Sequence, residues 1–171
     1  RGAGALGRHL RRISPLIWPA SRLHLARLST ASPSASPQVL SGEPPESDHL
    51  KRACTFLLSK QNANGGWGED FTSCYDKAYA KDGMARFGSG GSGVVNTAWA
   101  LLALLAASCD DAAALKRGAE YLMREQLATG DWKQEGIAGV FNRACGISYT
   151  AYRNIFPIWA LGRYARHYEP E

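Results

Sequence analysis

Acidic residues are missing from the start of the chain, where none precedes Glu43. The same segment holds six arginines and no lysine, whereas from Glu43 onward 14 basic residues face 15 acidic ones. The net charge of +5 on 171 residues therefore comes from the amino-terminal segment, and the remainder is nearly neutral. A nearly neutral body offers phosphates no dense Lys/Arg stripe, which excludes a basic nucleic-acid-binding fold.

Long apolar runs and closely spaced cysteines are missing too. The longest apolar run, 98–107, has ten residues, whereas a membrane-spanning helix needs about 20. The four cysteines include no CxxC pair and none of the close spacing that zinc sites use. We therefore expect no transmembrane helix, no metal site, and free thiols in a reducing compartment. The cysteines are Cys54, Cys74, Cys109 and Cys145.

The amino-terminal segment also differs from the rest in its prolines. Six of the eight prolines precede Glu46, and arginine, serine and alanine are abundant around them. This composition does not favour a packed core, and organelle transit peptides share it. We predict that residues 1–46 form a disordered basic head that mimics a transit peptide, and that residues 47–171 form the folded body.

In the body, apolar residues recur at helical spacing between glycine-containing loops. We expect four helices, of which the second is apolar all round, as in a helix packed on several sides. The last contains Pro157, which should kink it or break it near Phe156. No period-two stretch is long enough for a sheet, so the predicted class is all-α. The helices are expected at about 48–61, 94–107, 112–127 and 147–167.

An internal repeat relates the first and third expected helices. Six positions recur at a single offset of 65 residues, and a repeat of this length indicates stacked supersecondary units. The matched pairs are Arg52 and Arg117, Phe56 and Tyr121, Leu57 and Leu122, Gln61 and Gln126, Gly65 and Gly130, and Trp67 and Trp132.

Each repeat ends in the motif Gln-x-x-x-Gly-x-Trp. The motif favours a helix that ends near the glutamine, a turn at the glycine, and an indole folded back onto the helix end. The glutamine amide can bond backbone groups left without partners at a neighbouring helix end. We therefore predict structural rather than catalytic roles for Gln61, Trp67, Gln126 and Trp132.

These two motifs resemble the QW repeats of triterpene cyclases. The stretch Gly139–Gly162, which begins Gly-Val-Phe-Asn, resembles the carboxyl-terminal signature of eukaryotic oxidosqualene cyclases, the lanosterol and cycloartenol synthases. The resemblance implies that residues 47–171 form the carboxyl-terminal part of an α/α barrel, or toroid, built from helix hairpins joined by QW turns. It implies a reaction that converts (S)-2,3-oxidosqualene to lanosterol or cycloartenol in sterol biosynthesis.

The same resemblance implies the site and its surroundings. Phe141 and Tyr149 match aromatic residues that line the substrate cavity, where ring faces stabilise carbocations by about 0.5 to 2 kcal/mol each. The implied partner is the hydrophobic isoprenoid 2,3-oxidosqualene, and no metal or organic cofactor is implied. The family sits on one leaflet of the endoplasmic reticulum membrane or of lipid droplets, through parts outside this chain.

The proton donor of the family is missing from the sequence. It is the aspartate of an Asp-Cys-Thr-Ala-type motif, and no Asp-Cys pair occurs here, so no catalytic residue is assigned. We expect the chain alone to be inactive as a cyclase. One alternative is a non-catalytic helical-repeat protein of the same fold that binds lipids or proteins. A protein-prenyltransferase subunit is the other, but it needs a zinc site that the cysteine and histidine spacings do not provide.

Overall fold

The computed structural model describes residues 44, 46–69, 91–137, 139–141 and 145–168. The predictions for the head and for Cys74 lie outside these residues, apart from positions 44 and 46. The helices are α4 (Asp48–Ser59), α6 (Val94–Ala106), α7 (Ala112–Arg124) and α8 (Tyr152–Tyr168), and the strands are β1 (Gly139–Phe141) and β2 (Cys145–Ile147).

Side-chain caps define where two of the helices begin. The Ser47 hydroxyl accepts a hydrogen bond from Leu50 N at the start of α4, and Asp111 accepts one from Ala114 N at the start of α7. Such caps satisfy amide groups that have no partner within the helix. The two helices begin at Asp48 and Ala112, so their predicted starts at about 48 and 112 are confirmed.

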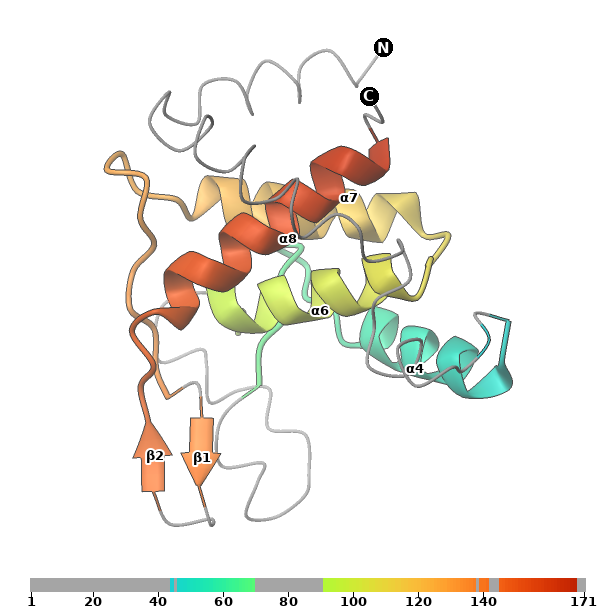
Figure 1. The fold of residues 1–171 in the computed structure, drawn as a ribbon, viewed down its shortest axis with the longest axis horizontal. Coiled ribbons are helices and arrows are strands. Elements are labelled where there is room, and N and C mark those ends of the chain that lie inside the picture. Colours follow the sequence, from blue (N-terminus) through green and yellow to red (C-terminus); the bar gives the residue numbers. More distant parts are fainter. Residues whose placement is uncertain (1–43, 45, 70–90, 138, 142–144, 169–171) are drawn as a thin grey trace.

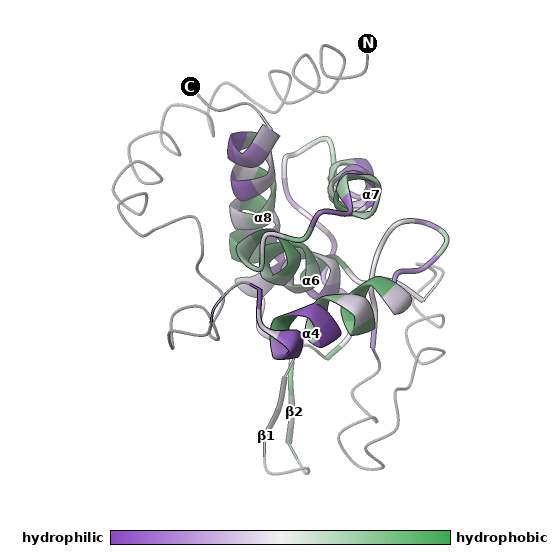
Figure 2. Ribbon diagram, turned by 90° about the vertical axis from the view of Figure 1, so that its right-hand side faces the viewer, coloured by the Kyte–Doolittle hydropathy of each residue, from purple (hydrophilic) through white to green (hydrophobic). Residues whose placement is uncertain are grey.

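Helix α6 lies at the centre and contacts each of the other three helices. Figure 1 shows α7 and α8 packed along it and α4 crossing near its end. In Figure 2 α6 is largely green, in keeping with apolar residues on all its faces. Its Leu101 and Leu104 are fully buried, as are Leu115 and Leu122 of α7. The all-α class and the prediction that α6 packs on several sides are confirmed.

The region before α8 differs from the prediction. Strands β1 and β2 pair as an antiparallel ribbon, with Gly139 opposite Ile147 and Phe141 opposite Cys145. The prediction of a helix from Ile147, and of no sheet at all, was wrong here. Strands of three residues are too short to show an alternating pattern, so periodicity carries no signal for them.

Pro157 does not break α8, which runs without interruption from Tyr152 to Tyr168. Of the two outcomes predicted for Pro157, the break near Phe156 was wrong and the kink stays a prediction. Because Pro157 lies only five residues after the start of α8, the single hydrogen bond that it removes falls near an end where amides already lack helical partners. Its ring is buried in the core, so packing offsets the lost bond. None of the described helices is long and apolar enough to cross a membrane.

The two QW turns, residues 61–67 and 126–132, share one backbone conformation. Gly65 has φ +89° and Gly130 has φ +86°. Gly65 N donates to Asn62 O at 2.9 Å, and Gly130 N donates to Leu127 O at 2.8 Å. The repeat seen in the sequence is therefore repeated in the structure at the same offset.

Gly65 also approaches the next repeat closely, which generates a prediction. A methyl group at this position would lie 2.5 Å from Arg117 O in α7. We expect Gly65→Ala to lower the free energy of unfolding by about 2 kcal/mol or more, from strained φ plus overlap. Gly130→Ala is the matched control, because Gly130 shares the φ but, among the described residues, has no such close contact with the backbone of another helix, and it should cost about 1 kcal/mol. Urea unfolding followed by circular dichroism measures both; equal losses would contradict the close approach.

Candidate functional site

The indole of each QW motif binds the end of the helix that precedes it. Trp67 Nε1 donates to Leu57 O at 2.7 Å, and Trp132 Nε1 donates to Leu122 O at 2.9 Å. Both acceptors are the third residue from the end of their helix, where carbonyls lack i+4 partners within the helix, and Leu57 O also accepts from Lys60 N. Both indoles are buried, so each bond closes a helix end inside the core.

The two glutamines make the same hydrogen bond within their turns but differ in their bonds to other helices. Gln61 Nε2 donates to Gly65 O and Gln126 Nε2 to Gly130 O, within their own turns. Gln61 Nε2 also donates to Ala114 O of α7 at 2.9 Å, and its Oε1 accepts from an Arg117 guanidinium nitrogen. Among the described residues, Gln126 makes no such bond to another helix. The glutamine of the first turn therefore joins that turn to the next repeat, whereas, among the described residues, the glutamine of the second turn bonds only within its own turn.

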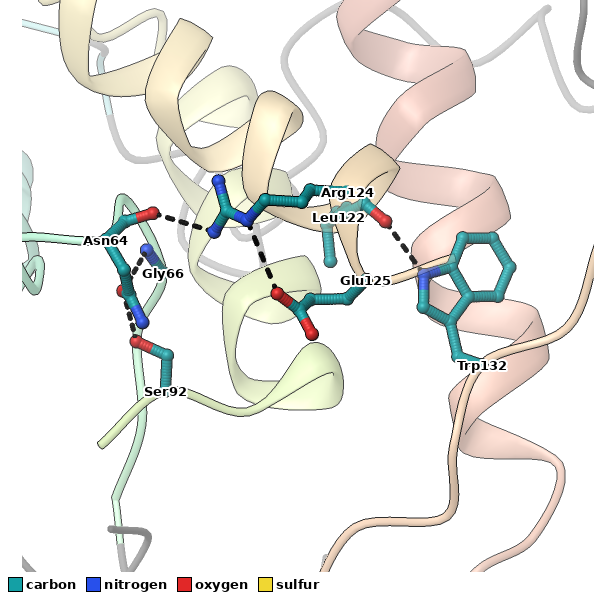
Figure 3. A network of polar contacts seen from close by, with 7 residues as sticks. All are labelled: Asn64, Gly66, Ser92, Leu122, Arg124, Glu125 and Trp132. Atoms are coloured by element: carbon teal, nitrogen blue, oxygen red, sulfur yellow. Dashed lines mark hydrogen bonds and ion pairs between the residues drawn. The ribbon is translucent and has the colours of Figure 1, made fainter. Parts of the chain in front are cut away.

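A polar network joins the first turn to the last turn of α7 (Figure 3). Arg124 donates to Asn64 O at 3.1 Å and pairs with Glu125 at 3.4 Å. The Asn64 side chain accepts from Gly66 N and from the Ser92 hydroxyl. The network thus fastens the loop of the first turn to the segment that leads into α6 and to the end of α7.

The backbone of Trp67 is also held by the start of α6. Trp67 N donates to the Thr97 hydroxyl at 2.9 Å, and Gly93 N donates to Trp67 O at 2.8 Å. On the other side, Gly118 of α7 leaves room for the ring, because a methyl group there would lie 2.8 Å from Trp67 Cζ3. One tryptophan therefore contacts α4, α6 and α7 together.

At the second turn, an arginine side chain binds the backbone of the tryptophan, where α6 groups do so at the first turn. Arg153 of α8 donates to Trp132 O at 2.8 Å and pairs with Asp131 at 3.1 Å. The guanidinium is partly shielded from solvent, so this pair is stronger than one at a fully exposed position. The second QW turn is thereby fixed to the amino-terminal end of α8.

The segment after Trp132 connects the second turn to the ribbon. Glu135 Oε2 accepts a hydrogen bond from Val94 N, the first residue of α6, at 2.5 Å. Gln134 Nε2 donates to the Ser148 hydroxyl at 2.8 Å, just after β2. The Ser148 hydroxyl in turn donates to Gly136 O at 3.3 Å. The base of the ribbon is therefore bound both to itself and to α6.

Glu135 is a half-buried carboxyl group with a perturbed pKa. Burial raises the pKa, the nearby Glu125 charge adds to the rise, and the hydrogen bond from Val94 N and the Lys133 charge oppose it. Tyr121 lies close enough for the Glu135 charge to contribute to the raised pKa of its phenol, although burial is the larger cause. The carboxylate thus has a favourable partner in a site that otherwise penalises its charge.

Of the two candidate cavity residues, one lies in the ribbon and the other just after it. Phe141 is the last residue of β1, and its side chain lies outside the described set. Tyr149 follows β2, is 40% exposed, and stacks on Tyr152 with ring centroids 4.6 Å apart. The structure therefore places both residues on one supersecondary unit.

Tyr149 begins a continuous line of ring contacts over α6 and α8. Tyr152 contacts Trp99 and Phe156, with centroids 5.8 and 5.1 Å away, and Phe156 contacts Trp159 at 6.3 Å. The contacts around Trp99, Tyr152 and Phe156 are edge-to-face, whereas those at the two ends of the line are stacked. Trp99 and Trp159 remain 36% and 44% exposed, so the line of rings forms a surface as well as an interhelical contact.

Sequence reasoning missed two residues that organise this region, Glu135 and Arg153. Each acts on a partner far along the chain, and no local pattern marks either of them. Asp131, which lies beside Trp132 in the second turn, forms an ion pair with Arg153. In the part of the chain that the structure describes, no group of three His, Cys, Asp or Glu side chains is placed to hold a metal ion.

Comparison with known proteins gives a consistent set of relatives. The family described as squalene-hopene cyclase C-terminal domain matches residues 37–166, which include the last ten residues of the predicted head, 37–46. The chain is 53% identical to human lanosterol synthase over 119 residues, 70% of this chain and 15% of that protein. It is 48% identical over 124 residues to alpha-onocerin synthase of Lycopodium clavatum, covering 70% and 15%. It is 44% identical over 123 residues to lanosterol synthase of Saccharomyces cerevisiae, covering 72% and 16%.

The different bonding of the two glutamines leads to a prediction. We expect Gln61→Ala to lower the free energy of unfolding by about 2 kcal/mol, since it removes bonds within the turn and to α7. Gln126→Ala is the matched control and should cost about 1 kcal/mol or less, because it loses one bond. Thermal unfolding followed by circular dichroism measures both; a larger loss for Gln126→Ala would show that the contacts to α7 contribute little.

The raised pKa of Glu135 leads to a prediction with a definite sign. A carboxyl with a raised folded pKa contributes most when protonated, and loses that contribution as pH rises from the unfolded toward the folded pKa. We therefore expect Glu135→Gln to match the parent chain in stability at low pH and to exceed it at neutral pH. Unfolding free energies of both chains across about pH 4 to 8 measure this. A difference that does not change with pH would contradict it.

Proposed function

Because the chain belongs to the squalene-hopene cyclase C-terminal domain family, we propose that it is the carboxyl-terminal part of an oxidosqualene cyclase. The proposed reaction is conversion of (S)-2,3-oxidosqualene to lanosterol, with cycloartenol as the alternative product. The observation that carries the proposal is 53% identity to human lanosterol synthase over 119 residues. The chain spans about 15% of the length of that relative, so the proposal concerns the enzyme of which this segment is a part.

The role proposed for this segment is to supply aromatic groups to the substrate cavity. Phe141 and Tyr149 would face the isoprenoid chain late in ring closure, where positive charge develops on carbon. Aromatic ring faces attract such charge through their quadrupole, at about 0.5 to 2 kcal/mol each. Support comes from the ribbon, which holds both residues beside a fixed helical core. The proton that opens the epoxide would come from another part of the enzyme.

We also propose that the repeats continue into an α/α toroid. At each end of the pair of repeats, one residue lacks contacts that the equivalent residue of the other repeat makes within the described structure. Phe56 of α4 is 54% exposed, whereas its repeat partner Tyr121 is 1% exposed under the neighbouring elements. At the other end, Gln126 makes no bond to another described helix, whereas Gln61 binds α7. A further repeat packed on each end would give both positions the environment that their partners already have.

The intact enzyme is proposed to act at the surface of the endoplasmic reticulum membrane or of lipid droplets. The resemblance to oxidosqualene cyclases supports this location, since their substrate is an isoprenoid with little solubility in water. Contact with the membrane would come from parts outside this chain.

One alternative has an observation in its favour. The sequence contains no Asp-Cys motif, which fits a helical-repeat protein that kept the fold and binds lipids or proteins without catalysis. The two functions differ in whether this segment can work inside an active cyclase.

A chimeric enzyme tests that difference. The segment of human lanosterol synthase that matches this chain over 119 residues would be replaced by the matching residues of this chain. We expect the chimera to make lanosterol from oxidosqualene and to support growth of yeast that lacks its own lanosterol synthase. The 171-residue chain alone should make no sterol. A chimera that folds and remains inactive would contradict the proposed function and favour the non-catalytic alternative.

A further inference from the structure

Helix α6 begins without a side-chain cap of its own. Its N-cap residue is Gly93, which has no side chain to accept a hydrogen bond. The amide of Val94 instead donates to Glu135 Oε2 at 2.5 Å, from a residue 41 positions later. A carboxylate at this place satisfies an amide that has no helical partner and interacts favourably with the helix dipole.

Residues on both sides of Glu135 are bound to the ribbon. Gln134 donates to the Ser148 hydroxyl at 2.8 Å, and that hydroxyl donates to Gly136 O at 3.3 Å. Ile137 packs closely on Gly146 of β2, where a methyl group would lie 2.7 Å from Ile137 Cδ1. The segment 134–137 is therefore one body with the base of the ribbon, and Glu135 is its bond to α6.

We propose that Glu135 is a positioning residue, which holds the ribbon that carries Phe141 and Tyr149 at a fixed place against the amino-terminal end of α6. The inference rests on the proposed function, since it assigns that ribbon to the cavity. Neither the family match nor the relatives assign any role to this carboxylate.

The environment of Glu135 explains why a single bond can act in this way. The carboxyl group is half-buried, so water competes poorly for Val94 N and the bond counts for more than it would at the surface. The charged groups that act on it are Glu125 and Lys133, with the Tyr121 phenol close by. Among the described residues, Glu135 is the one whose side chain accepts the hydrogen bond of Val94 N.

The consequence for catalysis depends on how cyclisation proceeds. Each cation must meet its stabilising ring before it loses a proton or reacts with water, and a displacement of about 1 Å costs much of this effect. A loosened ribbon would therefore change which cation is quenched, and so which products form. Loss of general stability would instead lower the amount of all products together.

The first test concerns the bond itself and uses the 171-residue chain. We expect Glu135→Ala to speed amide exchange at Val94 by about tenfold, because its acceptor is lost. Glu135→Gln keeps an oxygen acceptor and should restore slow exchange. Glu120→Ala is the matched control, since Glu120 pairs with Lys116 at the surface of α7, and it should leave exchange at Val94 unchanged. Equal exchange in Glu135→Ala and the parent chain would overturn the inference.

The second test concerns products and uses the lanosterol-forming chimera. Glu135→Ala should raise the share of incompletely cyclised products several-fold and resemble Phe141→Ala in its product profile, whereas Glu135→Gln should keep lanosterol as the main product. Leu115→Ala, a core change in α7, should lower total product without changing the profile. An unchanged profile in Glu135→Ala would overturn the inference while the active parent chimera still supports the proposed function. A parent chimera that folds but is inactive would contradict the proposed function. The amide exchange at Val94 would then still test whether Glu135 holds the ribbon against α6.

Discussion

The hydrogen bond from each QW indole to a helix carbonyl is the contact on which the rest of the structure depends. A helix end carries carbonyls without partners, and burying them unpaired costs about 1–3 kcal/mol each. Leu57 O, near the end of α4, accepts from Lys60 N and also from the indole N–H of Trp67, so an apolar ring covers this helix end. That ring then fills space against α6 and against Gly118 of α7. A polar requirement of one helix is thereby met by a side chain that also packs the next helix.

From the second of these turns, a short series of contacts leads to the candidate cavity residues. Trp132 closes α7, and Arg153 binds Trp132 O and Asp131 so that α8 starts at a defined place. Among the three residues after Trp132, Glu135 binds α6 and Gln134 binds Ser148 at the base of the ribbon. The ribbon is therefore an extension of the packed core, and its position is set by the same turn that stabilises the helices. This arrangement suits a cavity wall, which needs aromatic rings held by a rigid support.

Local features of the fold were predictable from sequence, and contacts between distant residues were not. The starts of α4 and α7, which their caps Ser47 and Asp111 define, and the turns repeated 65 residues apart all arise within single helices and turns. The ribbon could not be predicted, because its strands of three residues are stabilised by pairing and by the contacts of Ser148 and Ile137. Pro157 was misjudged since its effect on a helix depends on how near it lies to the helix start and on how well the ring packs. The partners of Glu135 and Arg153 lie 41 and 21 residues away, which no local pattern indicates.

The two repeats share the conformation of the QW turn but differ in the segment that follows it. The turns carry the contacts that stabilise the helices, and the segment after the second turn carries the candidate site. After the first turn, Trp67 O is bound by Gly93 N and Trp67 N by the Thr97 hydroxyl, both at the start of α6. After the second turn, the corresponding Trp132 O is bound by the Arg153 side chain, which reaches it from inside α8. The second turn is thus bound through a side chain to the helix that follows it, and the ribbon lies in the connection between turn and helix. Because the helix-closing bonds are unaffected by this change, the connection could take on aromatic residues for a cavity without weakening the repeat. The same reasoning places the candidate site on the connection and the main stabilising contacts on the turns.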